Sequence, residues 1–358
     1  MKRELNIALL PGDGIGPEIM NQAVKGLEAI SQVYGHTFRY TKALIGACAI
    51  RSEGDPYPPA THEICVASDA ILFGAIGHPD YDNNPSAKIR PEQGLLRMRR
   101  DLGLFANVRP LVLFESLADR SPLRPEVIRG TDFVCVRELT GGIYFGEPRG
   151  RDHDGTRAFD TCVYTRNEVD RILELAFKLA AKRRGLLTLV DKANVLETSR
   201  LWREAAQSMA VGYPGVTLEF MFVDNAAMQL IRQPAHFDVM VTENLFGDIL
   251  TDEAGMLSGS LGMLPSASIG LKHALFEPIH GSYPSAAGKN IANPMAMILS
   301  ASMMLEHLGL GEEGMHVRRA VETALEEGVV TEDLTRKGES SFSTSFVGDF
   351  VADCIKNK

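Results

Sequence analysis

Residues 5–18 read LNIALLPGDGIGPE and join an apolar segment to a helical segment through a glycine-rich turn. Leu5 to Leu10 are typical of a buried β-strand, and Pro17 suits the first turn of a helix. The glycines follow the spacing G-x-G-x-G, whereas a dinucleotide-binding Rossmann turn has G-x-G-x-x-G. The stretch therefore predicts an α/β fold of another kind. Taken alone, it fits either a ligand-binding loop or a tight strand-to-helix turn.

The rest of the chain alternates short apolar runs, bounded by glycine or proline, with longer amphipathic stretches. This alternation predicts an α/β protein. The predicted strands cover residues 5–10, 70–73, 133–137, 186–190, 218–223 and 238–241, and the predicted helices cover 17–34, 167–184, 201–210 and 294–308. Thr165 is a predicted N-cap with Glu168 three residues later, and Gly185 fits the end of the same helix.

Composition narrows the class of function. The chain has 358 residues, of which 45% are hydrophobic and 23% charged, so it can form one large or two ordinary domains. A net charge of -9 and a pI near 5.6 argue against nucleic acid as the main partner. No apolar run approaches the ~18 residues of a membrane span, and the start lacks the apolar core of a signal peptide. We therefore expect a cytoplasmic protein that binds small ligands.

The five cysteines form an odd set without a C-x-x-C pair or neighbouring histidines at zinc spacing. They are Cys48, Cys65, Cys135, Cys162 and Cys354. This pattern predicts reduced thiols, as in a reducing cytoplasm, rather than disulfides or a zinc site.

Residues 141–163 interrupt the alternation with a glycine-rich and charged connection between two β-prone pieces. Such a segment is typical of a projecting hairpin arm, which needs a partner surface and so predicts an oligomer. A disordered surface loop is the alternative.

Three aspartates form the first candidate site. In the stretch 244–253, NLFGDILTDE, a helix from about Gly247 would place Asp248 and Asp252 on one face. Asp224 follows the predicted strand 218–223, at the end of a strand where α/β proteins bind ligands. Three carboxylates with open positions suit Mg²⁺ or Mn²⁺ better than zinc. The alternative is an acidic helix start exposed to solvent.

Basic and proton-transferring residues lie near other predicted strand ends. Arginines occur in LLRMRR (95–100), NVRP (107–110) and VRE (136–138), and converging arginines predict a substrate with more than one carboxylate. Lys192 follows the strand 186–190, and Tyr144 lies in a glycine-rich turn. Both can transfer protons if burial or a nearby cation lowers their pKa values. Surface arginines, an exposed lysine and a packing tyrosine are the alternatives.

A long loop forms the last candidate. Residues 277–294 read EPIHGSYPSAAGKNIANP, which is too rich in glycine, proline, asparagine and serine for a helix before Pro294. Its backbone amides and short polar side chains could wrap a nucleotide. An ordinary irregular crossover is the alternative.

Taken together and in this order, the segments resemble the β-decarboxylating dehydrogenases, the family of the isocitrate and isopropylmalate dehydrogenases. The resemblance covers nearly the whole chain and rests on LPGDGIGPE, VRELTGGIYFGEPRG, VDKANVLETSRLWRE, NLFGDILTDEAG and GKNIANP. It implies an α/β isopropylmalate/isocitrate dehydrogenase-like fold, not a Rossmann fold, with two α/β domains. Residues 1–104 with 259–358 would form a large discontinuous domain that carries the nucleotide loop. Residues 105–258 would form a smaller dimerisation domain with the arm near 141–163.

The resemblance also implies roles for individual residues. Tyr144, Lys192 and Asp224 would be catalytic, and a homodimer would share its active sites, with Lys192 and Asp224 reaching across from the second subunit. Lys192 would take the proton of the substrate hydroxyl, hydride would pass to the nicotinamide, CO₂ would leave, and Tyr144 would protonate the remaining carbon. The metal ligands would be Asp224, Asp248 and Asp252. The substrate ligands would be Glu92, Leu95, Leu96, Arg99, Arg109, Arg137, Asn194 and Asp224. The cofactor ligands would be His78, Pro79, Glu92, Glu277, His280, Gly281, Ser282, Tyr283, Pro284, Ser285, Ala286, Ala287, Gly288 and Asn293.

The substrate is inferred from the residues that would meet its third substituent. Leu95 and Leu96, preceded by Glu92, suit a branched alkyl group, which indicates 3-isopropylmalate and a role in leucine biosynthesis. Isocitrate and homoisocitrate enzymes are the alternatives. So are D-malate and tartrate enzymes, which resemble this chain less over RELTGGIYFG. A non-catalytic relative would lack at least one of the catalytic or metal-binding residues, and all are present.

The cofactor loop departs from the pattern of most NAD-using relatives, which have G-S-A-P-D-I-A-G. This chain has Tyr283, Ser285 and Ala286 instead, so it lacks the aspartate that would meet the adenosine ribose. No lysine or arginine replaces that aspartate to attract the 2′-phosphate of NADP. We therefore expect NAD as cofactor, and we expect Tyr283 to pack near the adenosine.

Overall fold

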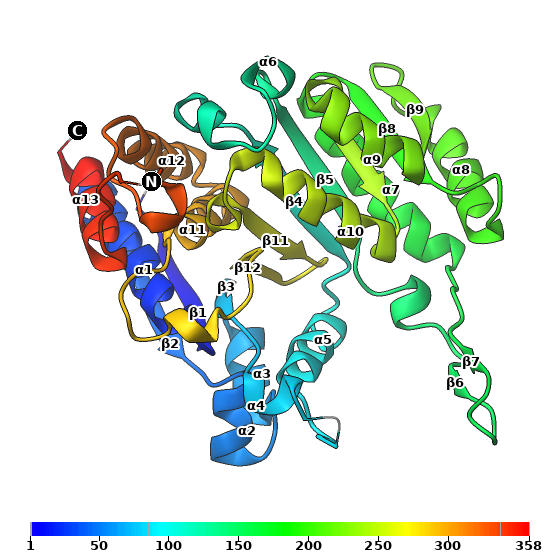
Figure 1. The fold of residues 1–358 in the computed structure, drawn as a ribbon, viewed down its shortest axis with the longest axis horizontal. Coiled ribbons are helices and arrows are strands. Elements are labelled where there is room, and N and C mark those ends of the chain that lie inside the picture. Colours follow the sequence, from blue (N-terminus) through cyan, green and yellow to red (C-terminus); the bar gives the residue numbers. More distant parts are fainter. Residues whose placement is uncertain (1, 85, 337, 358) are drawn as a thin grey trace. The chain divides into compact units, whose positions relative to one another are not determined.

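The computed structural model describes residues 2–84, 86–336 and 338–357. The chain forms two compact units, each with a sheet and helices (Figure 1). The first consists of Met1–Leu104 with Gly259–Lys358, and the second of Phe105–Ser258. These are the same ranges as those that the resemblance implies.

The first unit contains five strands in the order β2-β1-β3-β12-β11. They are β1 (Glu4–Gly12), β2 (Thr37–Lys42), β3 (Ala70–Ala75), β11 (Pro265–Ile269) and β12 (Ala274–Pro278). Strand β1 pairs in parallel with both β2 and β3, and β3 pairs in parallel with β12, whereas β11 and β12 are antiparallel. A Rossmann sheet has a different strand order, so the structure agrees with the glycine spacing in residues 12–16.

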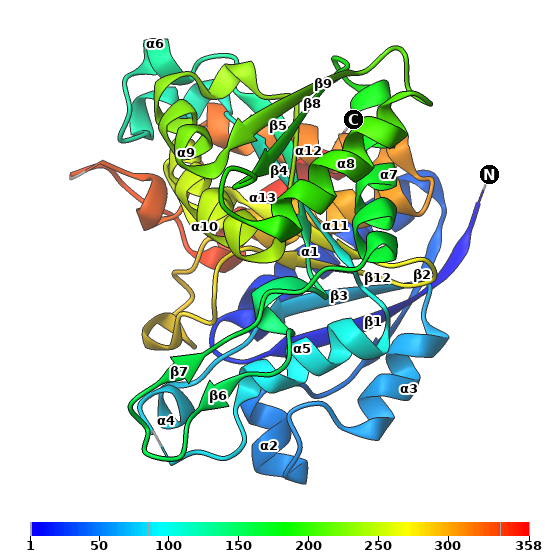
Figure 2. The same ribbon diagram turned by 90° about the vertical axis from the view of Figure 1, so that its right-hand side faces the viewer.

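Helices cover both faces of this sheet, which explains why β1 is apolar at consecutive positions. Ala8 and Leu10 pack in a core cluster with Cys65 and Met98, whereas Ile7 and Leu9 are equally buried but alternate with them along the strand. Figure 2 shows α3 (Pro59–Ala67) and α5 (Pro91–Asp101) on one side of β1 and β3, and α1 (Gly16–Tyr34) and α11 (Met295–His307) on the other. The remaining helices of this unit are α2 (Ala47–Glu53), α4 (Pro79–Asp82), α12 (Gly311–Glu326) and α13 (Thr344–Lys356).

The second unit contains five strands in the order β4-β5-β10-β8-β9. They are β4 (Ala106–Val112), β5 (Asp132–Glu138), β8 (Leu186–Asp191), β9 (Thr217–Phe222) and β10 (Val239–Thr242). Strands β4 and β5 are antiparallel, and the other neighbours are parallel. The helices are α6 (Pro125–Ile128), α7 (Arg166–Lys182), α8 (Glu197–Ala210), α9 (Val223–Arg232) and α10 (Asn244–Gly255).

Local sequence signals place the helix ends with few exceptions. Thr165 and Glu168 form the predicted capping box at the start of α7. Strand β9 ends at Phe222, one residue earlier than predicted, and Asp224 lies at its carboxyl end in the first turn of α9. Helix α10 begins at Asn244, three residues before the predicted start, because the Glu243 carboxylate accepts the Phe246 N–H at 3.0 Å and caps the helix.

The predicted hairpin arm is present in the second unit. Strands β6 (Gly150–Arg151) and β7 (Ala158–Phe159) pair antiparallel, all four residues are exposed, and the hairpin extends away from the rest of that unit (Figure 1). All five cysteines lie in the described part of the chain and are free thiols, as predicted. None of the described helices is long and apolar enough to cross a membrane.

Candidate active site

Helix α5 carries four of the predicted substrate ligands at one helical spacing. Glu92, Leu95, Leu96 and Arg99 follow the pattern i, i+3, i+4, i+7 and therefore share a face. Leu96 is 38% exposed, and Leu95 is partly packed against the core cluster. The helix thus places two apolar side chains between a carboxylate and a guanidinium on one surface.

Arg99 has donor capacity that the protein itself does not use. Its Nη2 donates to Glu277 at 2.8 Å, and the same Glu277 oxygen accepts from the Ser268 hydroxyl at 3.1 Å. The Arg99 Nε is buried and has no hydrogen-bond partner among the described residues. Because an unpaired buried donor is costly, this atom indicates a place for an anionic ligand.

Arg109 and Arg137 lie on the antiparallel strands β4 and β5 of the second unit, and both are at least 90% buried. Arg137 donates through Nε and Nη2 to the Asn244 Oδ1, at 3.1 and 2.8 Å, and through Nη1 to Asp248. Arg109 donates through Nη1 to the Thr251 hydroxyl at 2.5 Å and to Asp252 at 3.2 Å. One face of α10 thus binds the guanidinium groups of both Arg109 and Arg137.

Tyr144 joins this cluster from the turn after β5. Its hydroxyl donates to Asp248 Oδ2 at 2.8 Å, and the Arg137 guanidinium lies over its ring at 5.7 Å from the centroid. Burial raises the pKa of Tyr144, and the Asp248 carboxylate raises it further. Burial therefore does not lower the pKa of Tyr144, whereas the effect of a nearby metal ion stays a prediction. The phenol is kept protonated, which is the form that can donate a proton.

Lys192 and Asp224 form a second pair in this unit. Lys192 directly follows β8, and its Nζ donates to Asp224 Oδ2 at 2.7 Å. The hydrogen bond from Lys192 is the main cause that lowers the pKa of the Asp224 carboxyl, so this group stays ionised. Asn194, two residues after Lys192, is exposed.

The three predicted metal ligands are brought together only in part. Asp248 and Asp252 lie one turn apart on α10, while Asp224 lies on α9. Within the described ranges, no group of three or more His, Cys, Asp or Glu side chains is close enough to hold a metal ion. Among the described residues, Asp224 therefore does not join Asp248 and Asp252 in one ligand group. Carboxylate oxygens are the donors that Mg²⁺ and Mn²⁺ prefer, so the chemistry of the set fits those ions.

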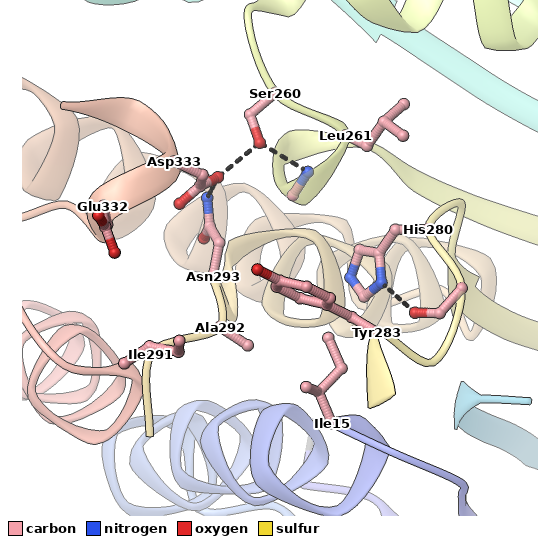
Figure 3. A pocket seen from close by; sticks show the side chains of 12 residues that line it. Ile15, Ser260, Leu261, His280, Tyr283, Ile291, Ala292, Asn293, Glu332 and Asp333 are labelled. Atoms are coloured by element: carbon pink, nitrogen blue, oxygen red, sulfur yellow. Dashed lines mark hydrogen bonds between the residues drawn. The ribbon is translucent and has the colours of Figure 1, made fainter. Parts of the chain in front are cut away.

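The first unit contains a cavity of about 600 Å³. Figure 3 shows its side chains, and its lining consists of Ile15, Ser260, Leu261, Gly262, His280, Gly281, Tyr283, Ile291, Ala292, Asn293, Glu332 and Asp333. His280, Gly281, Tyr283 and Asn293 belong to the predicted cofactor set. The other predicted cofactor residues do not line this cavity.

Those other residues have local roles that the structure makes visible. His78 and Pro79 begin α4, where the His78 ring accepts the Asp80 N–H at 3.3 Å. Glu92 lies beside Gly77, so that a Cβ on this glycine would be 3.1 Å from the carboxylate. In the loop, Ser282 and Ala286 are buried, whereas Pro284, Ser285, Ala287 and Gly288 are exposed.

The glycine-rich turn of residues 12–18 supports the loop that forms the cavity wall. The Ile15 N–H donates to the Ser282 carbonyl at 2.9 Å, and the Glu18 carboxylate accepts the N–H groups of Gly288 and, at 3.1 Å, Asn290. A Cβ on Gly14 would lie 1.9 Å from the Ser282 carbonyl oxygen, so only glycine permits this approach. The turn is therefore a scaffold for the loop.

His280 presents an unused acceptor in the cavity wall. Its Nδ1 lies 3.0 Å from the Gly281 carbonyl, which can only accept, so Nδ1 carries the proton and Nε2 is an acceptor. Nε2 is buried and has no partner in the described part of the chain. Burial lowers the pKa of His280, which keeps the ring neutral. An unsatisfied buried acceptor beside a cavity fits a ligand that carries an N–H donor.

Eight lining residues were missed by the sequence analysis. Asp333 is the most connected of them and accepts from Ser260 at 2.5 Å, Asn293 at 3.0 Å and Thr331 at 2.5 Å. It lies in a short turn after α12, remote in sequence from the loop, and no spacing motif marks it. Ile15 lies in the glycine-rich turn, which the sequence offered as a possible ligand-binding loop. That interpretation could have identified Ile15 as a lining residue.

Comparison with known proteins identifies the family. Residues 6–351 match the sequence profile described as isocitrate/isopropylmalate dehydrogenase. The chain belongs to this family. It is 53% identical to the 3-isopropylmalate dehydrogenase of Bacteroides fragilis over 99% of both chains, and 54% identical to that of Halalkalibacterium halodurans over 99% of this chain and 98% of the relative. The resemblance inferred from the sequence is confirmed.

Solved structures of family members agree with the fold. An isocitrate dehydrogenase from Methylococcus capsulatus is 36% identical with a TM-score of 0.88 and covers 100% of both chains. A β-decarboxylating dehydrogenase from Thermococcus kodakarensis, in its apo form, is 34% identical with a TM-score of 0.81 and covers 100% of this chain and 97% of its own. The predicted fold class is therefore confirmed.

Proposed function

We propose that this protein is a 3-isopropylmalate dehydrogenase of leucine biosynthesis. It oxidatively decarboxylates (2R,3S)-3-isopropylmalate to 4-methyl-2-oxopentanoate and CO₂, with reduction of NAD. The observation that carries this proposal is the full-length identity of 51–54% to relatives of that name, against 36% to the isocitrate dehydrogenase structure. The exposed Leu96 and partly buried Leu95 on α5 support an alkyl rather than a carboxylate substituent.

The proposed substrate ligands are already arranged as ion pairs. Arg99 pairs with Glu277, Arg109 with Asp252, Arg137 with Asp248, and Lys192 with Asp224. Four cations thus face four carboxylates one to one. A substrate that carries two carboxylates can bind together with one divalent metal ion without a change in the net charge of the site. The arginines then pair with the substrate carboxylates, and the aspartates bind the metal ion. This exchange supports a ternary site for an anionic substrate and a metal.

Asp224, Asp248 and Asp252 would hold Mg²⁺ or Mn²⁺, which would supply Lewis-acid chemistry at the substrate. The chain's own residues move the protons. Lys192, oriented by Asp224, would take the proton of the 2-hydroxyl as the neutral amine, after its own proton has passed to solvent. Bound NAD would supply the acceptor for the hydride of C2. After the β-carboxylate departs as CO₂, Tyr144 protonates the carbon that carried it. Burial, which raises the pKa of Tyr144, keeps that proton on the phenol before the reaction.

We propose that the active unit is a homodimer with shared sites. Helices α9 and α10 contact each other and expose Met228 at 60%, Ile231 at 51% and Ile249 at 59%. The same two helices carry Asp224 and the Asp248–Asp252 pair. Covering an apolar face with a second copy would both bury these side chains and bring the two halves of the metal set together.

NAD is the proposed cofactor, and the cavity of the first unit is its proposed adenosine site. Two carboxylates, on Glu332 and Asp333, line this cavity, and none of its lining residues is a lysine or arginine. A 2′-phosphate would meet like charge there, which favours NAD over NADP. The unused Nε2 of His280 supports a ligand with an amino group.

A substrate panel tests the reaction. Initial rates are measured with 3-isopropylmalate, isocitrate, homoisocitrate, D-malate and tartrate, each with NAD and NADP, with and without Mg²⁺ or Mn²⁺. We expect the highest kcat/KM with 3-isopropylmalate and NAD in the presence of metal. A higher kcat/KM with another acid would contradict the proposed substrate. Full activity after chelation would contradict the metal dependence, and a preference for NADP would contradict the proposed cofactor.

Subunit mixing tests the shared site. D224N and D248N should each be inactive, but their random mixture contains heterodimers in which one site has Asp224 from one chain and Asp248 from the other. We expect the mixture to recover about a quarter of wild-type activity, because half of the dimers each regain one of two sites. An inactive mixture that forms heterodimers would show that each site uses a single chain.

A further inference from the structure

Glu138 is a fully buried carboxylate beside a proposed substrate ligand. It follows Arg137 as the last residue of β5, and neighbouring residues of a strand point to opposite faces of the sheet. Arg137 binds α10, whereas Glu138 is 0% exposed and pairs with Arg171 of α7 at 3.2 Å. A buried charge is costly unless it is paired and hydrogen-bonded. The partners of Glu138 therefore show which part of the structure it stabilises.

The Glu138 carboxylate holds the start of the turn that carries Tyr144. Both of its oxygens accept the Thr140 N–H at 3.0 Å, and Oε2 accepts the Gly141 N–H at 2.7 Å. Oε1 also accepts the Thr140 hydroxyl at 2.7 Å. Burial raises the pKa of Glu138, and these hydrogen bonds oppose the rise. Since all of these groups donate, the arrangement matches the ionised carboxylate.

Tyr164 packs against the next part of the same turn. A Cβ on Gly141 would lie 2.6 Å from Tyr164 Cε1, and a Cβ on Gly142 would lie 2.4 Å from the Tyr164 hydroxyl, so the contact requires glycine. The Gly142 N–H donates to the Val163 carbonyl at 3.0 Å. The Tyr164 hydroxyl accepts the Asn244 N–H at 3.0 Å, at the start of α10. The turn and the start of α10 thus contact one side chain.

The turn is tied to α10 on one side and to β5 on the other. The Gly141 carbonyl accepts from the Asn244 amide Nδ2 at 3.2 Å, and the Tyr144 hydroxyl donates to Asp248 at 2.8 Å. Glu138 fixes the same turn to β5. A general acid contributes to a rate only within hydrogen-bond reach of the atom that it protonates. Because a displacement of about 1 Å can cost on the order of 100-fold in rate, the place of the turn matters for the phenol.

We propose that Glu138 is a positioning residue for Tyr144. Its carboxylate holds the turn of residues 140–144 where the phenol can donate its proton. Because Glu138 is fully buried, it acts through the backbone of Thr140 and Gly141 and not by contact with a substrate. This inference rests on the proposed dehydrogenase function, in which Tyr144 protonates the carbon that has lost CO₂.

E138Q tests the proposal with little change in side-chain shape. It replaces one acceptor oxygen by an NH₂ group, which cannot accept the N–H of Thr140 or Gly141. We expect kcat with 3-isopropylmalate to fall roughly 10- to 100-fold, while the KM for NAD stays within about 2-fold of the wild-type value. In the Y144F background, E138Q should change kcat by less than about 2-fold, because the group that Glu138 positions is already removed.

D238N is the matched control for the loss of a buried carboxylate. Asp238 is also 0% exposed and pairs with Arg183 at 2.8 Å. It precedes β10, which runs parallel to β5, whereas Glu138 ends β5, so the two carboxylates lie at opposite ends of this strand pair. D238N should lower the unfolding temperature but keep kcat within about 2-fold of wild type.

R171Q is a milder variant that keeps the test valid if E138Q does not fold. The Arg171 side chain is 35% exposed, and its guanidinium donates to Glu138 and to the Thr140 hydroxyl. We expect R171Q to lower kcat in the same direction as E138Q but by less, and to have no further effect in the Y144F background.

A readout without turnover follows the Tyr144 phenol directly. In protein labelled with ¹³C at tyrosine Cζ, the Tyr144 signal is assigned by its absence from Y144F. This signal should shift in E138Q and R171Q but not in D238N, because only the first two variants change the support of the turn.

Three outcomes would overturn the proposal. They are an unchanged kcat and Tyr144 signal in folded E138Q or R171Q, an equal loss of kcat in the wild-type and Y144F backgrounds, and a loss in D238N as large as that in E138Q. A wild-type protein that does not turn over 3-isopropylmalate would instead refute the proposed function. In that case the Tyr144 signal alone decides whether Glu138 positions the phenol.

Discussion

Replacing Glu18 by alanine should loosen the nucleotide loop without unfolding the protein. The Glu18 carboxylate accepts the N–H groups of Gly288 and Asn290, the latter at 3.1 Å. Gly288 and Asn290 both have positive φ, so this part of the loop adopts a conformation that depends on being held. Other anchors remain, because the Thr344 N–H still donates to the Asn290 carbonyl at 3.0 Å. We therefore expect local loosening rather than loss of the fold.

The size of the effect follows from those two hydrogen bonds. Both are exposed, so we assign each about 1 kcal/mol, below the range of about 1.5–3 kcal/mol for hydrogen bonds to charged groups. Their joint loss of about 2 kcal/mol shifts the ordered fraction of the loop by up to about 30-fold. Apparent affinity falls in proportion to the fraction that is competent to bind. We expect E18A to bind 5′-AMP about 5- to 30-fold more weakly.

Calorimetry with 5′-AMP measures the affinity, and amide hydrogen exchange measures the loop. The amides of residues 288 and 290 should exchange faster in E18A, while those in the middle of α1 should keep their protection. Glu28 lies on the same helix and is exposed, so E28A is the matched control and should behave like the wild type. If E18A binds 5′-AMP with wild-type affinity and the amides of residues 288 and 290 exchange at an unchanged rate, Glu18 does not hold the loop.

Three further outcomes follow from the second unit. Y144F should keep its fold, as checked by thermal unfolding, but lose about 100-fold or more in kcat with 3-isopropylmalate, and a near-normal kcat would rule out Tyr144 as proton donor. R137K removes the two guanidinium N–H groups that donate to the Asn244 Oδ1, and a lysine cannot replace both. The KM for 3-isopropylmalate should therefore rise about 10-fold or more, with little change in the KM for NAD. Equal increases in both KM values would argue against a role of Arg137 in substrate binding. Burial raises the pKa of Glu243 above its ordinary 4.5, so its contribution to stability is complete below that pH and is lost as pH rises through the folded-state pKa. Urea unfolding should therefore show E243Q gaining stability relative to wild type between about pH 4 and about pH 7, and a change in the opposite direction would contradict this sign.

The sequence by itself determined the features that depend on neighbouring residues. The apolar runs predict the strands, and the capping box of Thr165 and Glu168 places the start of α7, because both signals act over a few residues. The identities of the candidate residues follow from motifs that match the family over nearly the whole chain. The failed Rossmann spacing in residues 12–16 excludes a Rossmann turn before any contact is known.

Only the tertiary structure decided which of these residues meet. Arg137 and Asp248 are 111 positions apart, and they pair because packing lays α10 across β5. The same packing leaves Asp224 on another helix, so one chain does not assemble the three aspartates. Tyr283 adopts a left-handed backbone because contacts from residue 15 and the core fix both of its sides, whereas local propensity favours an extended residue before proline. Long-range contacts overrule local preferences at these positions, and no pattern within a short window reports them.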